Sequence, residues 1–151
     1  MSVEYINKWL GFLDDVDSEM SRIACEKLAK TQDPAVVQPL TRALRNRPLE
    51  VRAAAARALG EIGQSDAVPA LVEALGDMES TVSCAAAYAL GDIRDPSAVP
   101  ALRGVLHNYR NGDRYSQLHG DDRGLYLAAL QALRQIGTSE AREAIAKYDS
   151  W

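Results

Sequence analysis

The stretch VRAAAARALGEIG, residues 51–63, decides the fold expected for this chain. Its apolar residues recur at the three- and four-residue spacing of one helix face, formed by Val51, Ala55, Leu59 and Ile62. Ala53, Ala54 and Arg57 fall on the opposite side of the same helix. A helix of this length is marginal alone in water, so its apolar face must be covered by neighbouring segments.

Similar segments recur along the chain, and they supply those neighbours. Gly60 recurs as Gly91, 31 residues further on. The segment DAVPALVEAL, residues 66–75, is similar to SAVPALRGVL, residues 97–106. Each repeat therefore predicts two helices, and the glycine lies inside the second of them. Because glycine costs roughly 1 kcal/mol against alanine in a helix, its return predicts a close crossing between second helices; the alternative is two chance glycines in an inherited duplication.

The first helix of each repeat has a recognisable opening. Asp33 and Asp95 each precede a proline, which predicts an N-cap followed by proline in the first turn. We expect the first helix of the second repeat to extend over about 34–46. Three further prolines fall early in first helices, where they should occupy opening turns or bend the helix: Pro39, Pro69 and Pro100.

These repeats predict one domain over residues 1–151, with four two-helix units and a capping helix. The boundaries are about 1–31, 32–63, 64–94 and 95–137 for the units, and 138–149 for the capping helix. Unit four breaks the period, because its residue equivalent to Gly91 lies 43 positions further on, at Arg134. The excess is rich in Asn, Gly, Asp and Ser and predicts an inserted loop over 107–123, a common place for binding in repeat proteins.

The composition narrows the class of protein. Hydrophobic residues make up 47% of the chain and charged residues 25%, which indicates a globular protein. A formal net charge of -4 argues against binding to nucleic acid, which needs a basic surface. Cys25 and Cys84 fall in different helices, too far apart for a disulfide bond, and Cys25 occupies a core position where it should be inert. Since no apolar run suits a signal peptide or a membrane span, we expect a cytoplasmic protein without membrane contact.

The repeated pattern resembles a known family. The helix pattern V-R-x-x-A-A-x-A-L-G-x-I-G, preceded by D-x-x-A-V-P-A-L, is similar to the HEAT-like repeats of the phycobilisome lyase type, most strongly over residues 33–106. The resemblance implies an all-α, right-handed α-solenoid of about four helical hairpins plus the capping helix. Proteins of this class act as binding scaffolds, as chromophore lyases on phycobiliproteins, and as a metal-dependent hydroxylase.

The resemblance also implies a binding surface, because second helices line the concave side of such solenoids. The variable positions of the four second helices predict partner contacts at Arg22, Glu26, Glu50, Arg57, Glu61, Cys84, Tyr88, Asp92, Arg123, Leu127 and Gln131. Arg57 and Tyr88 belong to the residue types that dominate binding energies at protein interfaces. The alternative interpretation is a solvated helix face without a partner.

No catalytic constellation is evident in the sequence. The hydroxylase of this class takes its iron ligands from His-Glu pairs, and this chain has no His-Glu dipeptide. His107 and His119 lie around the insertion in a spacing that fits no recognised metal site. Cys84 is a candidate nucleophile, but no histidine is placed to activate it, so a small groove residue is the preferred interpretation. We therefore predict neither a metal nor a cofactor.

Two functions remain open from the sequence. The first is a non-catalytic scaffold that binds a protein partner on its second helices. The alternative is a subunit of a bilin lyase or another chromophore-handling factor, with a phycobiliprotein as one candidate partner. In that case Tyr88, Cys84 and two loop tyrosines, Tyr109 and Tyr115, would be candidate contacts to the chromophore. The sequence alone favours the scaffold.

Overall fold

The computed structural model describes residues 1–45, 47–111 and 122–149, and its regular elements there are all helices joined by short connections. The α-helices are α1 Val3–Leu13, α2 Ser18–Ala29, α3 Val37–Ala43, α4 Leu49–Ile62, α5 Val68–Ala74, α6 Ser80–Ile93, α7 Val99–Asn111, α9 Asp122–Ile136 and α10 Ser139–Tyr148. Three short 3₁₀ helices precede α3, α5 and α7, at Pro34–Val36, Ser65–Ala67 and Pro96–Ala98. Within these residues no strand forms, and no helix is long and apolar enough to cross a lipid bilayer.

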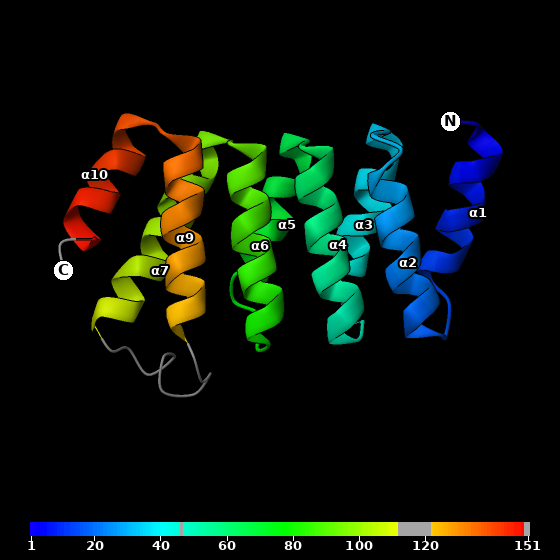
Figure 1. Ribbon diagram of the computed structural model, residues 1–151, viewed down its shortest axis with the longest axis horizontal. Coiled ribbons are helices and arrows are strands. Elements are labelled where there is room, and N and C mark those ends of the chain that lie inside the picture. Colours follow the sequence, from blue (N-terminus) through cyan, green and yellow to red (C-terminus); the bar gives the residue numbers. More distant parts are fainter. Residues whose placement is uncertain (46, 112–121, 150–151) are drawn as a thin grey trace.

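The helices form two rows. In Figure 1 the helices α2, α4, α6 and α9 stand side by side in front, and α3, α5 and α7 lie behind them. Each front helix packs on the next front helix and on the rear helix of its own hairpin. Helices α1 and α10 lie at opposite ends of the array. The prediction of an all-α solenoid built from stacked helical hairpins is therefore confirmed.

The rear helices begin differently from the continuous helix predicted over 34–46. Asp33 caps a 3₁₀ turn by accepting a hydrogen bond from the Ala35 amide at 2.8 Å, and α3 begins only at Val37 and ends at Ala43. The prolines explain the change, because a start at Val37 puts Pro39 in the first α-helical turn, where its missing N–H breaks no bond. Asp95 caps the equivalent turn, and the amide of Ser97 keeps the pKa of its carboxyl below the usual value.

The second helices are buried on three sides, and one expectation fails for this reason. Ala53 and Ala54 are only 1% and 3% exposed, so their predicted outward position is wrong. Helix α4 packs between α2 and α6 and against α3, which leaves only a narrow strip of its surface in solvent. One leucine of each second helix lies at the same repeat position, and all four are fully buried: Leu28, Leu59, Leu90 and Leu133. These leucines form a continuous apolar spine.

The two repeat glycines lie where neighbouring second helices cross, as predicted. A Cβ on Gly60 would lie 2.8 Å from the Ala89 Cα of α6. A Cβ on Gly91 would lie equally close, at 2.8 Å, to the Ala132 Cα of α9. Both contacts are shorter than van der Waals distance to backbone atoms, so the spacing between second helices depends on glycine at these positions.

The predicted loop over 107–123 is wrong at both of its ends. Residues 107–111 belong to α7 and residues 122 and 123 to α9, and residues 112–121 lie outside the described part of the chain. Although the composition of residues 107–111 is typical of a loop, packing contacts hold them in α7. The Tyr109 ring lies 4.6 Å from the Tyr126 ring, and His107 Nδ1 lies 3.1 Å from the Tyr148 hydroxyl. Tyr115 and His119 fall in the part that is not described.

Candidate functional site

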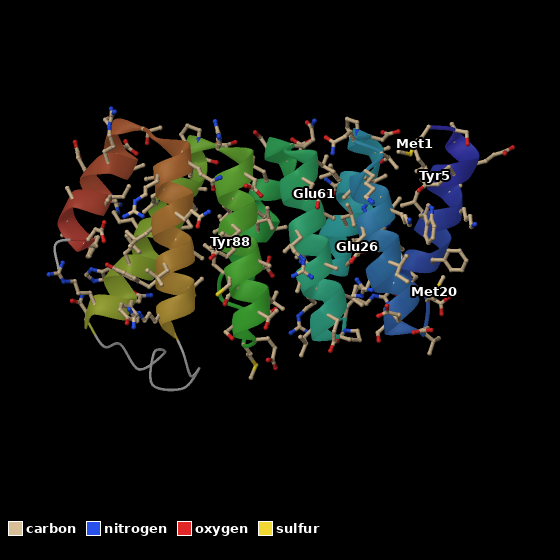
Figure 2. The ribbon with its side chains drawn as sticks, in the orientation of Figure 1. Met1, Tyr5, Met20, Glu26, Glu61 and Tyr88 are labelled. Atoms are coloured by element: carbon tan, nitrogen blue, oxygen red, sulfur yellow. The ribbon has the colours of Figure 1, made fainter. Side chains whose placement is uncertain are left out.

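The candidate site is the exposed strip of α2, α4, α6 and α9, here called the front face. All predicted partner contacts keep accessible surface: Arg22 and Cys84 are partly buried, and the other nine are exposed. Figure 2 labels Glu26, Glu61 and Tyr88 on three successive helices of this face. The repeat spacing places Glu26, Arg57, Tyr88 and Gln131 at equivalent positions of the four helices. The front face is therefore a regular surface with one variable residue from each repeat at each level.

A groove of about 420 Å³ runs between α4 and α6 on this face. It brings together five of the predicted contacts, namely Arg57, Glu61, Cys84, Tyr88 and Asp92. Thr81, Ala85 and Ala89 complete its lining. Sequence reasoning missed Ala89, since an alanine next to the apolar stripe looks like a core residue. The remaining predicted contacts lie on the same face but outside this groove.

The charges of the front face differ from helix to helix. On α2 the Arg22 guanidinium bonds to Glu26 and to Glu19, and these bonds raise the pKa of Arg22 and lower that of Glu19. In the groove, by contrast, neither Arg57 nor Glu61 forms an ion pair with any described residue. The charge on α2 is thus largely compensated internally, whereas the groove presents both signs of charge to solvent.

The apolar part of the front face lies toward the C-terminal end. Tyr88 on α6 is 42% exposed and Leu127 on α9 is 51% exposed, which is high for large apolar side chains. Cys84 occupies the repeat position of Leu127, and its Sγ would lie 3.6 Å from a Cβ on Gly124. Exposed aromatic and aliphatic side chains thus lie beside a charged groove, and tyrosine and arginine are residue types enriched at protein interfaces.

The two cysteines have different environments. They do not form a disulfide bond with each other, as predicted. Cys25 is completely buried, and burial raises the pKa of its thiol to about 12, so it stays protonated and unreactive at neutral pH. Cys84 reaches the groove. Among the residues of the described ranges, no three His, Cys, Asp or Glu side chains converge as metal ligands.

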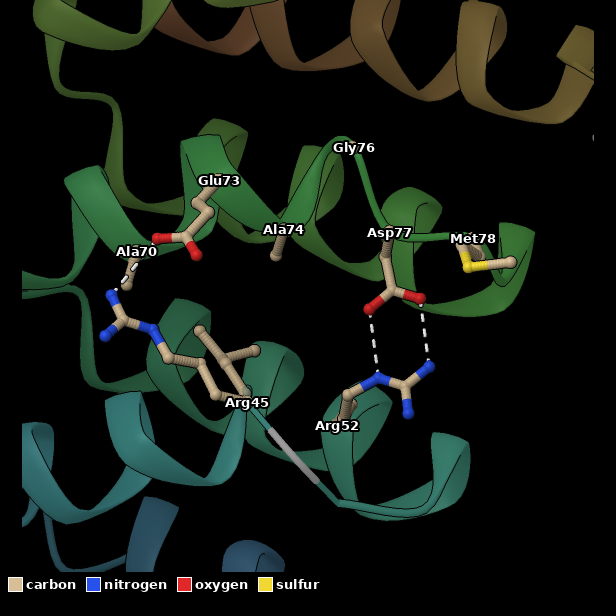
Figure 3. A pocket seen from close by; sticks show the side chains of 9 residues that line it. Arg45, Arg52, Ala70, Glu73, Ala74, Gly76, Asp77 and Met78 are labelled. Carbon is tan, nitrogen blue, oxygen red and sulfur yellow. Dashed lines mark hydrogen bonds and ion pairs between the residues drawn. The ribbon is translucent and has the colours of Figure 1, made fainter. Parts of the chain in front are cut away.

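A second groove, of about 590 Å³, lies on α3, α4 and α5 away from the front face (Figure 3). At one end of this groove, Arg52 donates two hydrogen bonds to the Asp77 carboxylate, at 2.9 and 3.0 Å. Arg45 pairs with Glu73 at its other end at 3.1 Å. Because the two arginines of this groove pair with its two carboxylates, we interpret it as a structural joint between hairpins.

The joint leads to a prediction on stability. We expect Asp77→Asn to lower the free energy of unfolding by about 2 kcal/mol, because the charge-assisted bidentate bond joins side chains only 20% and 13% exposed. Glu73→Gln is the matched control on the same groove. Its ion pair is 58% and 66% exposed, so this variant should lose less than about 1 kcal/mol. Urea denaturation measures both, and equal losses would contradict the structural role of Arg52.

The chain matches the family profile of HEAT repeats over residues 6–78 and 45–118. Among solved structures it is similar to a chain in the complex of CpcE and CpcF of phycocyanin lyase from Nostoc sp. PCC7120, with 26% identity and a TM-score of 0.74. That similarity covers 95% of this chain and 63% of the Nostoc chain.

A second solved structure is an engineered protein. It shares 22% identity with this chain at a TM-score of 0.55. The match covers 95% of this chain and 85% of the engineered protein, and it supports the fold alone. No curated protein sequence gives a significant match. The comparisons thus agree with the helical array seen in the structure, and a chain of a lyase complex is among the solved structures that resemble it.

Proposed function

This chain belongs to the HEAT repeat family, and from that premise we propose that it is a subunit of a bilin lyase or related chromophore-handling complex. One observation carries the proposal: the similarity to a chain of the phycocyanin lyase complex extends over nearly the whole of this chain. It favours this function over the non-catalytic scaffold that the sequence alone favoured. The activity would be to attach, remove or isomerise a bilin on an antenna protein.

Within such a complex, we assign this chain the part of holding a protein partner. The front face supports this assignment, since its groove combines an exposed tyrosine with charges that have no ion-pair partner among the described residues. The chain spans 63% of the length of the Nostoc chain it resembles. Because that structure is a complex of CpcE and CpcF, we expect this chain to act together with a second subunit, and the partners would be that subunit and a phycobiliprotein.

The test is spectroscopic. The purified chain is mixed with phycocyanobilin and apo-phycocyanin, alone and with purified CpcE or CpcF added as the second subunit. We expect the visible absorption band of the bilin to shift and sharpen in at least one mixture that contains this chain, and not when the chain is omitted. If no mixture differs from its control without the chain, the lyase proposal fails and the scaffold function is the one that remains.

A further inference from the structure

The groove between α4 and α6 lies along two neighbouring helices and is lined partly by small side chains. Its floor is formed by small side chains, Ala85 and Ala89, at the point where α6 crosses α4 beside Gly60. Small residues between two roughly parallel helices leave a channel along their length, and a third helix can lay its side chains into it. Amphipathic helices commonly bind protein grooves in this way. The groove therefore fits an α-helix running along α4 and α6.

The charges in the groove are arranged along the same direction. Arg57 and Glu61 lie four residues apart on α4, which places them one turn, about 6 Å, apart along the helix axis. Asp92 occupies the repeat position of Glu61 on α6, so two carboxylates flank one end of the groove. Tyr88 occupies the repeat position of Arg57, at the level of the cation. The groove thus has a cationic, aromatic level and, one turn away, an anionic level.

The groove charges form no ion pairs among the described residues. Arg57 and Glu61 have no ion-pair partner in the described residues, and Asp92 accepts one hydrogen bond, from Gln135 at 3.4 Å. The neighbouring helices differ. On α2 the equivalent level is occupied by Glu26, which pairs with Arg22, and on α9 it is the uncharged Gln131. The α4–α6 groove is where both signs of charge are presented at a fixed spacing.

We propose that this groove binds one helix of the partner protein, which presents an acidic side chain to Arg57 and, one turn away, a basic side chain to Glu61 and Asp92. An acid and a base four residues apart lie on one side of a helix, so they match the two levels of the groove simultaneously. A leucine between them would cover Tyr88. The inference rests on the proposed function only in assigning a protein partner to the front face.

The test uses two synthetic, alanine-based helical peptides of equal composition. One contains Glu and Arg four residues apart with Leu between them, and the other has Glu and Arg two residues apart, on different sides of the helix. Each is titrated into the ¹⁵N-labelled full chain up to millimolar concentration. We expect the matched peptide to bind about fivefold more tightly, the value for two exposed ion pairs, with amide shifts centred on Arg57, Tyr88 and Asp92.

A variant pair completes the test. Arg57→Glu should remove the difference between the two peptides, whereas Arg142→Glu, an exposed arginine on α10, should leave it unchanged. Circular dichroism confirms that both variants are folded. Equal binding of the two peptides to the unaltered chain, or no binding of either, overturns the proposal. Peptide binding without any response to phycocyanin would instead keep the groove assignment and refute the lyase function.

Discussion

Replacing Gly60 with alanine should lower the free energy of unfolding by about 2 kcal/mol, although alanine is the better helix former. The added Cβ would lie 2.8 Å from the Ala89 Cα and 3.0 Å from its Cβ. Both atoms belong to the rigid middle of α6, so α4 and α6 must move apart. We expect this overpacking to exceed the gain of about 1 kcal/mol in helix propensity.

The chain offers a matched control for this prediction. Gly104 lies inside α7, and a Cβ added there would meet nothing within 4 Å. Gly104→Ala should therefore stabilise the protein by about 0.5–1 kcal/mol through helix propensity alone. The same chemical change thus has opposite signs at two helical positions, and urea denaturation distinguishes them. Stabilisation by both substitutions would show that α4 and α6 do not cross as closely as they do in the structure.

Gly60 also illustrates what the sequence could predict. A residue that disfavours helices, recurring inside helices at a fixed spacing, has its explanation in packing between repeats, and the structure confirms that explanation. The burial of Ala53 and Ala54 could not be predicted in the same way. An apolar stripe is assigned by assuming one buried face and one solvated face, and a helix enclosed on three sides does not meet that assumption. Only contacts between repeats reveal how narrow the exposed strip is.

Other features depended on partners distant in sequence. The composition of residues 107–111 predicts a loop, but contacts of His107 and Tyr109 with Tyr148 and Tyr126 keep them helical. For the front face, the repeat spacing was enough to place its residues together. The ion pairs of Arg22 follow from i,i+3 and i,i+4 spacing and were available from the sequence. To predict which groove charges form no ion pair, one would need the positions of all the neighbouring helices.

The second large effect concerns the partner protein. Under the proposed function, in which apo-phycocyanin is a partner, we expect Arg57→Glu combined with Tyr88→Ala to weaken its binding by at least about 100-fold, as measured by isothermal titration calorimetry. Arginine and tyrosine at the centre of an interface commonly contribute more than 2 kcal/mol each. Both side chains are exposed and line one groove, so their loss should leave the fold intact.

The control makes a charge reversal and an apolar truncation away from the front face, as Arg142→Glu with Val3→Ala. Val3 on α1 is 71% exposed, and Arg142 is exposed on α10. A comparable loss of binding in this control would show that the partner does not use the front face.

The two single variants separate the physical contributions to binding. Arg57 should act through charge, so the effect of Arg57→Glu should shrink as added salt screens it over a Debye length of about 8 Å at physiological ionic strength. Tyr88 should act through the apolar area it covers, so the effect of Tyr88→Ala should not depend on salt. If both effects fade together in high salt, the groove attracts its partner only electrostatically, and the aromatic level has no part in holding it.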